Sequence, residues 1–166
     1  PNAENIRMHY ETGGGATMDM GCYPISWVRH ITKEEPKVVS ATATVGNPDV
    51  DLRLEVNYEF EKGLTAKTVG SMCDAGFAAD MEVRGSNGRM LVVNPLGPQH
   101  GNKIELTVGT ESSEEECTRR STYSFQLDAF VDAVRNGTRL PTDSADAVKQ
   151  MRVIDAAYLA AGMKTR

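Results

Sequence analysis

A strict alternation of apolar and polar residues over residues 50–61 is the feature that most restricts how this chain can fold. The segment reads VDLRLEVNYEFE, which places Val50, Leu54 and Tyr58 on one face and polar side chains, Asp51 among them, on the other. A side-chain period of two is that of a β-strand with one face on a core and the other in water. The segment therefore predicts a half-buried strand in a layered domain.

Short turns connect this segment to further strand candidates. Residues 61–63, EKG, lead into a second alternating run at 64–73, and residues 86–88, SNG, separate strand candidates at 81–85 and 89–93. Residues 38–45 and 103–108 add two more. Strands joined by such turns run antiparallel, because parallel neighbours need crossovers of about a dozen residues or more. The acidic run at 114–116 follows two serines and predicts a solvated loop.

Helical spacing precedes and follows these strands. Residues 16–31 carry the helical stripe Met18, Cys22, Ile25 and then Val28 or Arg29, and Pro24 within them predicts a kink or a later helix start. A second helix at about 123–136 ends at Asn136-Gly137, which we interpret as a helix stop rather than a glycosylation site. The last helix begins at a capping residue within 142–144 and runs to about 161, with the buried side chains Val148, Met151, Ile154 and Tyr158. This order predicts an α+β domain.

Composition restricts the partners of this chain of 166 residues. The net charge is −5 and the basic residues are scattered, which argues against a surface for nucleic acid or for an anionic membrane. No apolar run reaches the roughly 18 residues that a membrane span needs. The three cysteines are far apart and the three histidines are isolated, so we expect no disulfide framework and no metal site. Reduced cysteines favour the cytoplasm, with the periplasm as the alternative.

Asp19 and Tyr23 are the first candidates for chemistry, since they lie one helical turn apart just beyond three glycines. Gly14 and Gly15 permit a close approach of the backbone, and Arg7 precedes them. A tyrosine can pass a proton while a neighbouring carboxylate orients a hydroxyl group. Spacing alone also allows a second interpretation, in which Asp19 interacts with the helix dipole and Tyr23 lies at the edge of the core.

The glycines do not complete a dinucleotide-binding fingerprint. Met18 stands where the third glycine belongs, and the segments that follow predict antiparallel strands rather than a parallel strand-helix-strand unit. We therefore expect no cofactor-binding residue in this chain.

Two segments make the chain similar to a known family. Residues 11–25, ETGGGATMDMGCYPI, and residues 151–158, MRVIDAAY, resemble the C-terminal domain of the glucose-fructose oxidoreductase, inositol dehydrogenase and rhizopine-catabolism (Gfo/Idh/MocA) family, and the likeness covers essentially the whole chain. The resemblance implies a large, open, mainly antiparallel sheet with helices on one face, following a Rossmann domain that is absent from these residues. A tyrosine at position 23, where many members carry histidine, is similar to the glucose-fructose oxidoreductase and dimeric dihydrodiol dehydrogenase subgroup.

The resemblance also implies an activity and a role for individual residues of this chain. The resemblance implies an NAD- or NADP-dependent oxidoreductase that interconverts alcohol and carbonyl by hydride transfer on a sugar, cyclitol or dihydrodiol. Tyr23 is then the proton donor or acceptor, Asp19 orients the substrate, and Arg7, Gly14 and Gly15 contact it. A lysine from the N-terminal Rossmann domain completes the catalytic set.

Residues 1–166 are thus interpreted as one substrate-binding and oligomerisation domain, the C-terminal fragment of a two-domain enzyme. We expect the fragment alone to be inactive, its partners to be its own Rossmann domain and further copies of itself, and the copies to associate through the open sheet face. The alternative is a non-catalytic module that kept the sheet for binding or self-association.

Overall fold

The computed structural model describes residues 4–166, which form two compact units. The first unit comprises residues 4–75 and 142–166, and the second comprises Gly76–Pro141. The first contains the 3₁₀ turns η1 (Ile6–Met8) and η2 (Tyr10–Thr12), the π-helix η3 (Thr17–Gly21), the helices α1 (Cys22–Thr32) and α3 (Ser144–Ala160), and the strands β1 (Lys37–Val45), β2 (Asp51–Glu59) and β3 (Thr65–Ser71).

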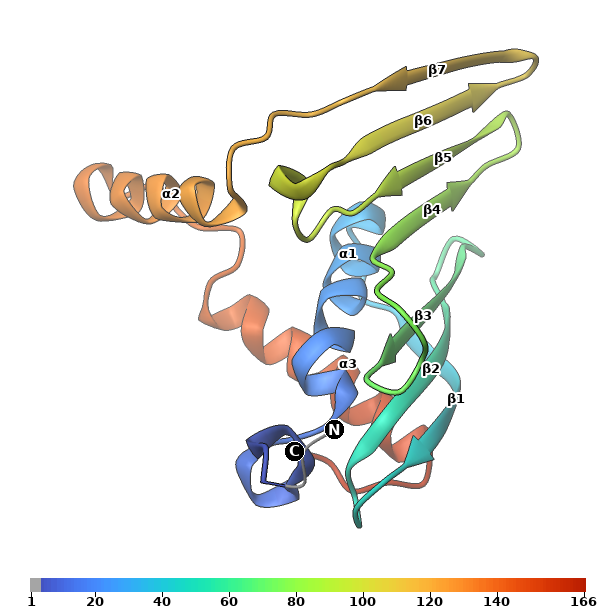
Figure 1. The fold of residues 1–166 in the computed structure, drawn as a ribbon, viewed down its shortest axis with the longest axis vertical. Coiled ribbons are helices and arrows are strands. Elements are labelled where there is room, and N and C mark those ends of the chain that lie inside the picture. The colour runs from blue at the N-terminus through green and yellow to red at the C-terminus, as the bar shows by residue number, and fades with distance from the viewer. Residues whose placement is uncertain (1–3) are drawn as a thin grey trace. The chain divides into compact units, whose positions relative to one another are not determined.

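A three-stranded antiparallel sheet in the order β1-β2-β3 carries the core of the first unit. Helices α1 and α3 cover one face of this sheet (Figure 1). The inward side chains of β2 meet the helices as the alternation predicts, and the outward ones remain polar. The buried cluster consists of Ile25, Leu54, Val56, Tyr58, Phe60, Val153, Ile154, Ala157, Tyr158 and Met163.

The start of β2 departs from the predicted alternation. Thr44 pairs with Arg53 but Val45 pairs with Asp51, so one extra residue, Leu52, is inserted in β2. Such a bulge reverses which side chains face inward. Asp51, expected on the water-facing side, is fully buried at 0% exposure. That expectation was wrong because an irregularity in strand pairing leaves no trace in the hydropathy pattern.

The first predicted helix begins with a π-helix rather than an α-helix. Residues Thr17–Gly21 form η3, and regular α-helix starts at Cys22, which confirms the later start that Pro24 predicted. Proline has no N–H to donate and its ring crowds the preceding turn, and a wider turn relieves both. Gly70 of β3 lets η3 lie against the sheet, because an added Cβ there would stand 2.7 Å from the Cα of Gly21.

Helix α3 follows the prediction closely. Asp143 caps it by accepting a hydrogen bond from the amide of Asp146 at 2.9 Å, and Ile154 and Tyr158 are buried. Val148 is 52% exposed, so its predicted burial was wrong. The buried side of the helix also includes Val153 and Ala157, the residues that precede Ile154 and Tyr158. None of the helices within residues 4–166 is both long and apolar enough to cross a membrane.

The second unit contains β4 (Asp80–Arg84), β5 (Gly88–Val93), η4 (Pro98–His100), β6 (Lys103–Val108), β7 (Glu111–Glu115) and α2 (Thr122–Asn136). Its four strands form an antiparallel sheet in the order β4-β5-β6-β7. The predicted acidic loop is the exposed edge strand β7, because pairing with β6 overrides the low strand propensity of glutamate. Gly137, in a left-handed conformation, ends α2 as predicted.

The two units together confirm the α+β class and the antiparallel arrangement, with the strands divided between two sheets. Burial differs between them. Every fully buried side chain within residues 4–166 belongs to the first unit, and none lies between Gly76 and Pro141. The side chains of the candidate site, Arg7, Asp19 and Tyr23, also belong to the first unit.

Candidate functional site

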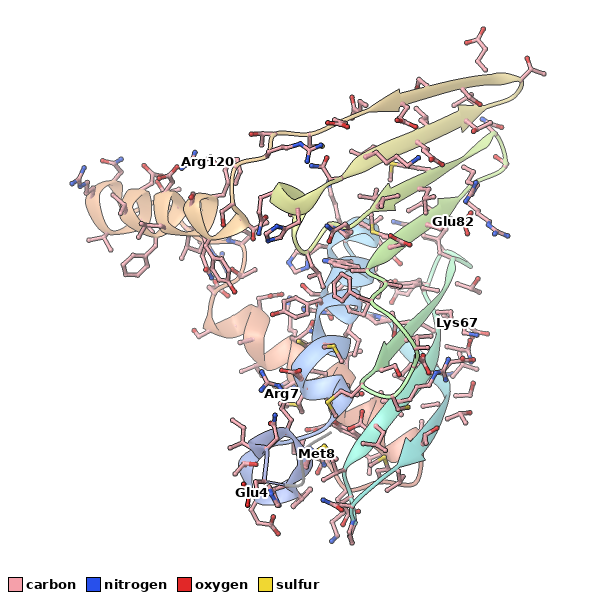
Figure 2. All side chains as sticks on the ribbon, in the orientation of Figure 1. Glu4, Arg7, Met8, Lys67, Glu82 and Arg120 are labelled. Carbon is pink, nitrogen blue, oxygen red and sulfur yellow. The ribbon has the colours of Figure 1, made fainter. Side chains whose placement is uncertain are left out.

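Arg7, Asp19 and Tyr23 are accessible to solvent on three elements of the first unit, η1, η3 and α1. Arg7 lies in η1, and Figure 2 shows its side chain near the start of the helix that follows. Its Nε donates to Oδ1 of Asp19 in η3 at 2.7 Å, with exposed side-chain fractions of 48% and 30%. Tyr23, the second residue of α1, is 46% exposed. The structure therefore joins Arg7 to Asp19 directly and leaves all three side chains open to a ligand.

Gly14 and Gly15 are buried and bond within the chain. The amide of Gly14 donates to the carbonyl of His9 and that of Gly15 to the carbonyl of Arg7, each at 2.9 Å. Gly15 has a φ of +124°, and an added Cβ would stand 2.1 Å from Oδ1 of Asp51. These amides are therefore engaged, and the two glycines serve to bring η1, η3 and β2 together.

The buried Asp51 carboxylate anchors the beginning of η3. Its Oδ2 accepts from the amide of Thr17 at 2.8 Å and from the Thr17 hydroxyl at 2.7 Å, and its Oδ1 accepts from the Tyr158 hydroxyl at 2.9 Å. A carboxylate at a helix N-terminus satisfies amides that have no partner within the helix. Burial, and next the negative charge of Asp51, raise the pKa of Tyr158, so this hydroxyl remains a neutral donor.

Arg166 completes this network from the end of the chain. Its guanidinium lies 3.7 Å from Asp51, is stacked 4.3 Å from the ring centroid of Tyr158, and donates to the carbonyl of Gly14 at 2.9 Å. It also donates to the carbonyl of Asp49 at 2.8 Å, and its side chain is only 4% exposed. The segment that carries Asp19 is thus fixed by β2, α3 and the last residue together.

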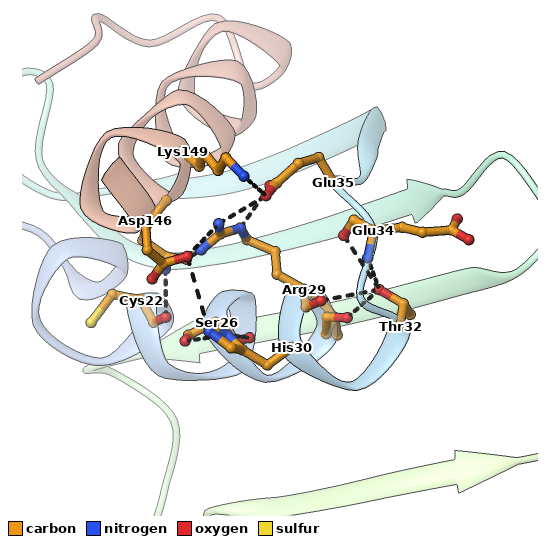
Figure 3. Close-up of polar contacts among 11 residues, drawn as sticks. Cys22, Ser26, Arg29, His30, Thr32, Glu34, Glu35, Asp146 and Lys149 are labelled. Carbon is orange, nitrogen blue, oxygen red and sulfur yellow. Dashed lines mark hydrogen bonds and ion pairs between the residues drawn. The ribbon is translucent and has the colours of Figure 1, made fainter. Parts of the chain in front are cut away.

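A second buried charge cluster joins α1 to α3 (Figure 3). The Arg29 guanidinium donates to Glu35 at 2.7 and 3.0 Å, to Asp146 at 2.8 Å and to Oε1 of Gln150 at 2.8 Å. Its side chain is 3% exposed. The hydrogen bonds from Arg29 hold the pKa of Glu35 below its usual range. Gln150 in turn donates to the carbonyl oxygen of Cys22 at 2.7 Å, next to Tyr23.

The described residues form neither a cluster of metal-ligating side chains nor a phosphate-binding loop. Within residues 4–166 no group of three or more histidine, cysteine, aspartate and glutamate side chains could hold an ion. The strands of both sheets are antiparallel, and the amides of Gly14 and Gly15 are occupied, so the phosphate-binding loop of a dinucleotide site is not formed here. Burial raises the pKa of Cys22, which makes its thiol a poor nucleophile.

Sequence reasoning proposed Arg7, Asp19 and Tyr23 as site residues, and it missed the side chains that hold the segment around them. Asp51 was hidden by the bulge, and the contacts of Gln150 and Arg166 join residues more than a hundred positions apart, which no local pattern reports. The one available signal was Arg29, a charged residue on the stripe predicted to face the core. A buried arginine requires partners, and it has them.

Curated proteins are similar in sequence to this chain over nearly its whole length. The chain is 29% identical to D-xylose 1-dehydrogenase (NADP(+)) 2 of Haloferax volcanii over 94% of its own length and 48% of that protein. It is 27% identical to the rhizopine catabolism protein MocA of Rhizobium meliloti over 95% of its length and 46% of that protein. The chain thus spans about half the length of these curated relatives.

Solved structures share the fold. Aldose-aldose oxidoreductase from Caulobacter crescentus, complexed with glycerol, matches 98% of the chain with a TM-score of 0.86 and 25% identity, over 50% of that protein. The 3-ketoreductase KijD10 from Actinomadura kijaniata matches 96% of the chain with a TM-score of 0.82 and 22% identity, over 50% of that protein. The family model described as the GFO/IDH/MocA C-terminal domain matches residues 1–91, more than half of the chain. The chain belongs to the GFO/IDH/MocA family.

Proposed function

We propose that this chain is the substrate-binding domain of an NAD(P)-dependent oxidoreductase that interconverts alcohol and carbonyl groups on a sugar, cyclitol or dihydrodiol. The observation that carries the proposal is the solvent-accessible Arg7–Asp19 ion pair, with the exposed Tyr23 at the start of the helix that follows Asp19. The relatives support it, since one is an NADP(+)-dependent D-xylose dehydrogenase and another an aldose-aldose oxidoreductase.

Each exposed side chain has a chemical part in this reaction. The Tyr23 hydroxyl donates its proton to the carbonyl oxygen during reduction and takes the proton of the alcohol during oxidation. The Asp19 carboxylate accepts hydrogen bonds from substrate hydroxyl groups, and Arg7 donates to substrate oxygens while it orients Asp19. Gly14 and Gly15 contribute by shaping the segment between Arg7 and Asp19, because both are buried.

The cofactor belongs to another part of the protein in this proposal. The described residues do not form a dinucleotide cradle, and the matched family model is that of a C-terminal domain. We infer that the nicotinamide cofactor, NAD or NADP, is held by an N-terminal Rossmann domain that faces Tyr23. All three cysteines of this chain are unpaired, which favours the reducing cytoplasm as the compartment of the protein.

The direct test is an activity assay on the full-length protein. We expect it to reduce NAD⁺ or NADP⁺ in the presence of an aldose or cyclitol, and we expect the isolated chain of residues 1–166 to do neither this nor bind either cofactor with micromolar affinity. The absorbance of the reduced nicotinamide measures the first and calorimetry the second. If the protein turns over no aldose, cyclitol or dihydrodiol of a test panel with either cofactor, the alternative of a non-catalytic binding module is favoured.

We further propose that copies of the protein associate through the exposed face of the sheet in the second unit. The sheet of the second unit has no fully buried side chain and exposes Leu106 and Val108 of β6 by 42% and 52%. Exposed apolar strands of this kind are normally covered by a partner. Light scattering after size exclusion should give at least a dimer for the full-length protein, with Leu106→Glu shifted toward the monomer. A monomer at high micromolar concentration would contradict the association.

A further inference from the structure

The backbone that carries Tyr23 is hydrogen-bonded by a side chain from another helix. Gln150 of α3 donates its Nε2–H to the carbonyl oxygen of Cys22 at 2.7 Å. That oxygen belongs to the planar peptide that links Cys22 to Tyr23, so its direction fixes the orientation of the N–Cα bond of Tyr23. Gln150 therefore acts on the position of Tyr23 without contact with its side chain.

The first turn of α1 needs such a donor more than an ordinary turn does. The π-helix η3 ends at Gly21, and α1 begins one residue before Tyr23. Pro24 supplies no N–H, so one hydrogen bond of this turn is missing. The hydrogen bond from Gln150 adds a donor to a turn in which Pro24 supplies none.

Gln150 is itself held in one orientation. Its Oε1 accepts from Nη1 of Arg29 at 2.8 Å, which directs the amide nitrogen toward Cys22. Arg29 is fixed in turn by Glu35 and Asp146, and its side chain is 3% exposed. The chain of contacts from Arg29 through Gln150 to the Cys22 carbonyl is therefore well ordered by charge-assisted hydrogen bonds.

We propose that Gln150 is a positioning residue for Tyr23, which keeps the phenol where it meets the reacting oxygen of the substrate. The proposal rests on the proposed function, in which Tyr23 moves the proton. A misplacement of about 1 Å can cost about 100-fold in rate, so the loss of this one hydrogen bond should cost about tenfold in kcat with a smaller change in KM.

The kinetic test is a double-mutant cycle in the full-length enzyme. Gln150→Met keeps the length of the side chain and removes both polar atoms of the amide, whereas Gln150→Glu keeps an oxygen for Arg29 and replaces the donor by a second, negatively charged oxygen. Both are expected to lower kcat about tenfold when residue 23 is tyrosine and to have no effect on the residual rate of Tyr23→Phe. Arg152→Met, which replaces an exposed cation on the same helix, is the matched control and should leave kcat unchanged.

A spectroscopic measurement reports the position of the peptide without activity. Cys22–Tyr23 is the only Cys–Tyr pair in this chain, so ¹³C-carbonyl cysteine combined with ¹⁵N-tyrosine labels that single peptide. Gln150→Met and Gln150→Glu should shift its carbonyl and amide signals, and Arg152→Met should not. Unfolding midpoints in urea within the spread of the control exclude a general loss of structure.

The outcomes separate this proposal from the function on which it rests. An equal loss of kcat from Gln150→Met in both backgrounds, an unchanged kcat, or an unshifted peptide signal overturns the role of Gln150 and leaves the role of Tyr23 intact. If the single variant Tyr23→Phe keeps the wild-type kcat, the proposed function is contradicted. The positioning role of Gln150 is then overturned with it.

Discussion

With Tyr23 as the proposed proton donor, its replacement by phenylalanine is expected to lower the kcat of the full-length protein by about 100- to 10,000-fold. This is the usual contribution of a side chain that transfers a proton in the transition state. The substitution removes only the hydroxyl, and the ring is 46% exposed, so the free energy of unfolding should change by no more than about 0.5 kcal/mol. Steady-state kinetics and urea unfolding of the same preparation measure the two quantities.

Tyr123→Phe supplies the matched control for this prediction. Tyr123 lies in α2 of the second unit and is 76% exposed, so the same chemical change there should alter neither kcat nor stability. A kcat of Tyr23→Phe within a factor of about three of the wild-type value would refute proton transfer by this residue. A large loss of stability would instead identify Tyr23 as a structural residue at the core edge, the second interpretation that its spacing allows.

The part of the fold that follows local rules could be predicted from the sequence. The alternation in residues 50–61 predicted β2, the glycine after Asn136 predicted the end of α2, and the capping residues within 142–144 predicted the start of α3. Each of these signals depends on the chemistry of a few adjacent residues. Asp19 and Tyr23 were likewise proposed as site residues from one short segment of the sequence.

The residues that hold the candidate site could not be predicted, because their positions depend on contacts between distant segments. Asp51 faces inward only because Leu52 forms a bulge against β1. Gln150 reaches the Cys22 carbonyl only because α3 packs beside α1. Gly15 contacts Asp51 only because β2 packs against the start of η3. Periodicity identifies which face of an element is apolar, but it does not identify which polar group that face encloses.

Loss of the Asp51 carboxylate is expected to cause the largest loss of stability in the first unit. Asp51→Ala leaves the Thr17 amide and hydroxyl and the Tyr158 hydroxyl without their acceptor and Arg166 without its counterion, all in a buried place. Removing one partner of a buried charged pair costs about 3–5 kcal/mol, far more than an exposed pair. Urea unfolding followed by circular dichroism measures the change.

A graded series of variants makes this prediction quantitative even where Asp51→Ala does not fold. Asp51→Asn keeps one acceptor oxygen and should lose less, and Tyr158→Phe removes a single hydrogen bond and should lose about 1–2 kcal/mol. Asp74→Ala removes a carboxylate that is 57% exposed and pairs with Arg53, and it should cost less than about 1 kcal/mol. A loss for Asp51→Asn no larger than that for Asp74→Ala would show that the carboxylate does not anchor η3. If Asp51→Asn loses more stability than Asp74→Ala, the start of the π-helix, and with it the Arg7–Asp19 pair, depends on the Asp51 carboxylate. The sequence alternation had predicted that this carboxylate faces solvent.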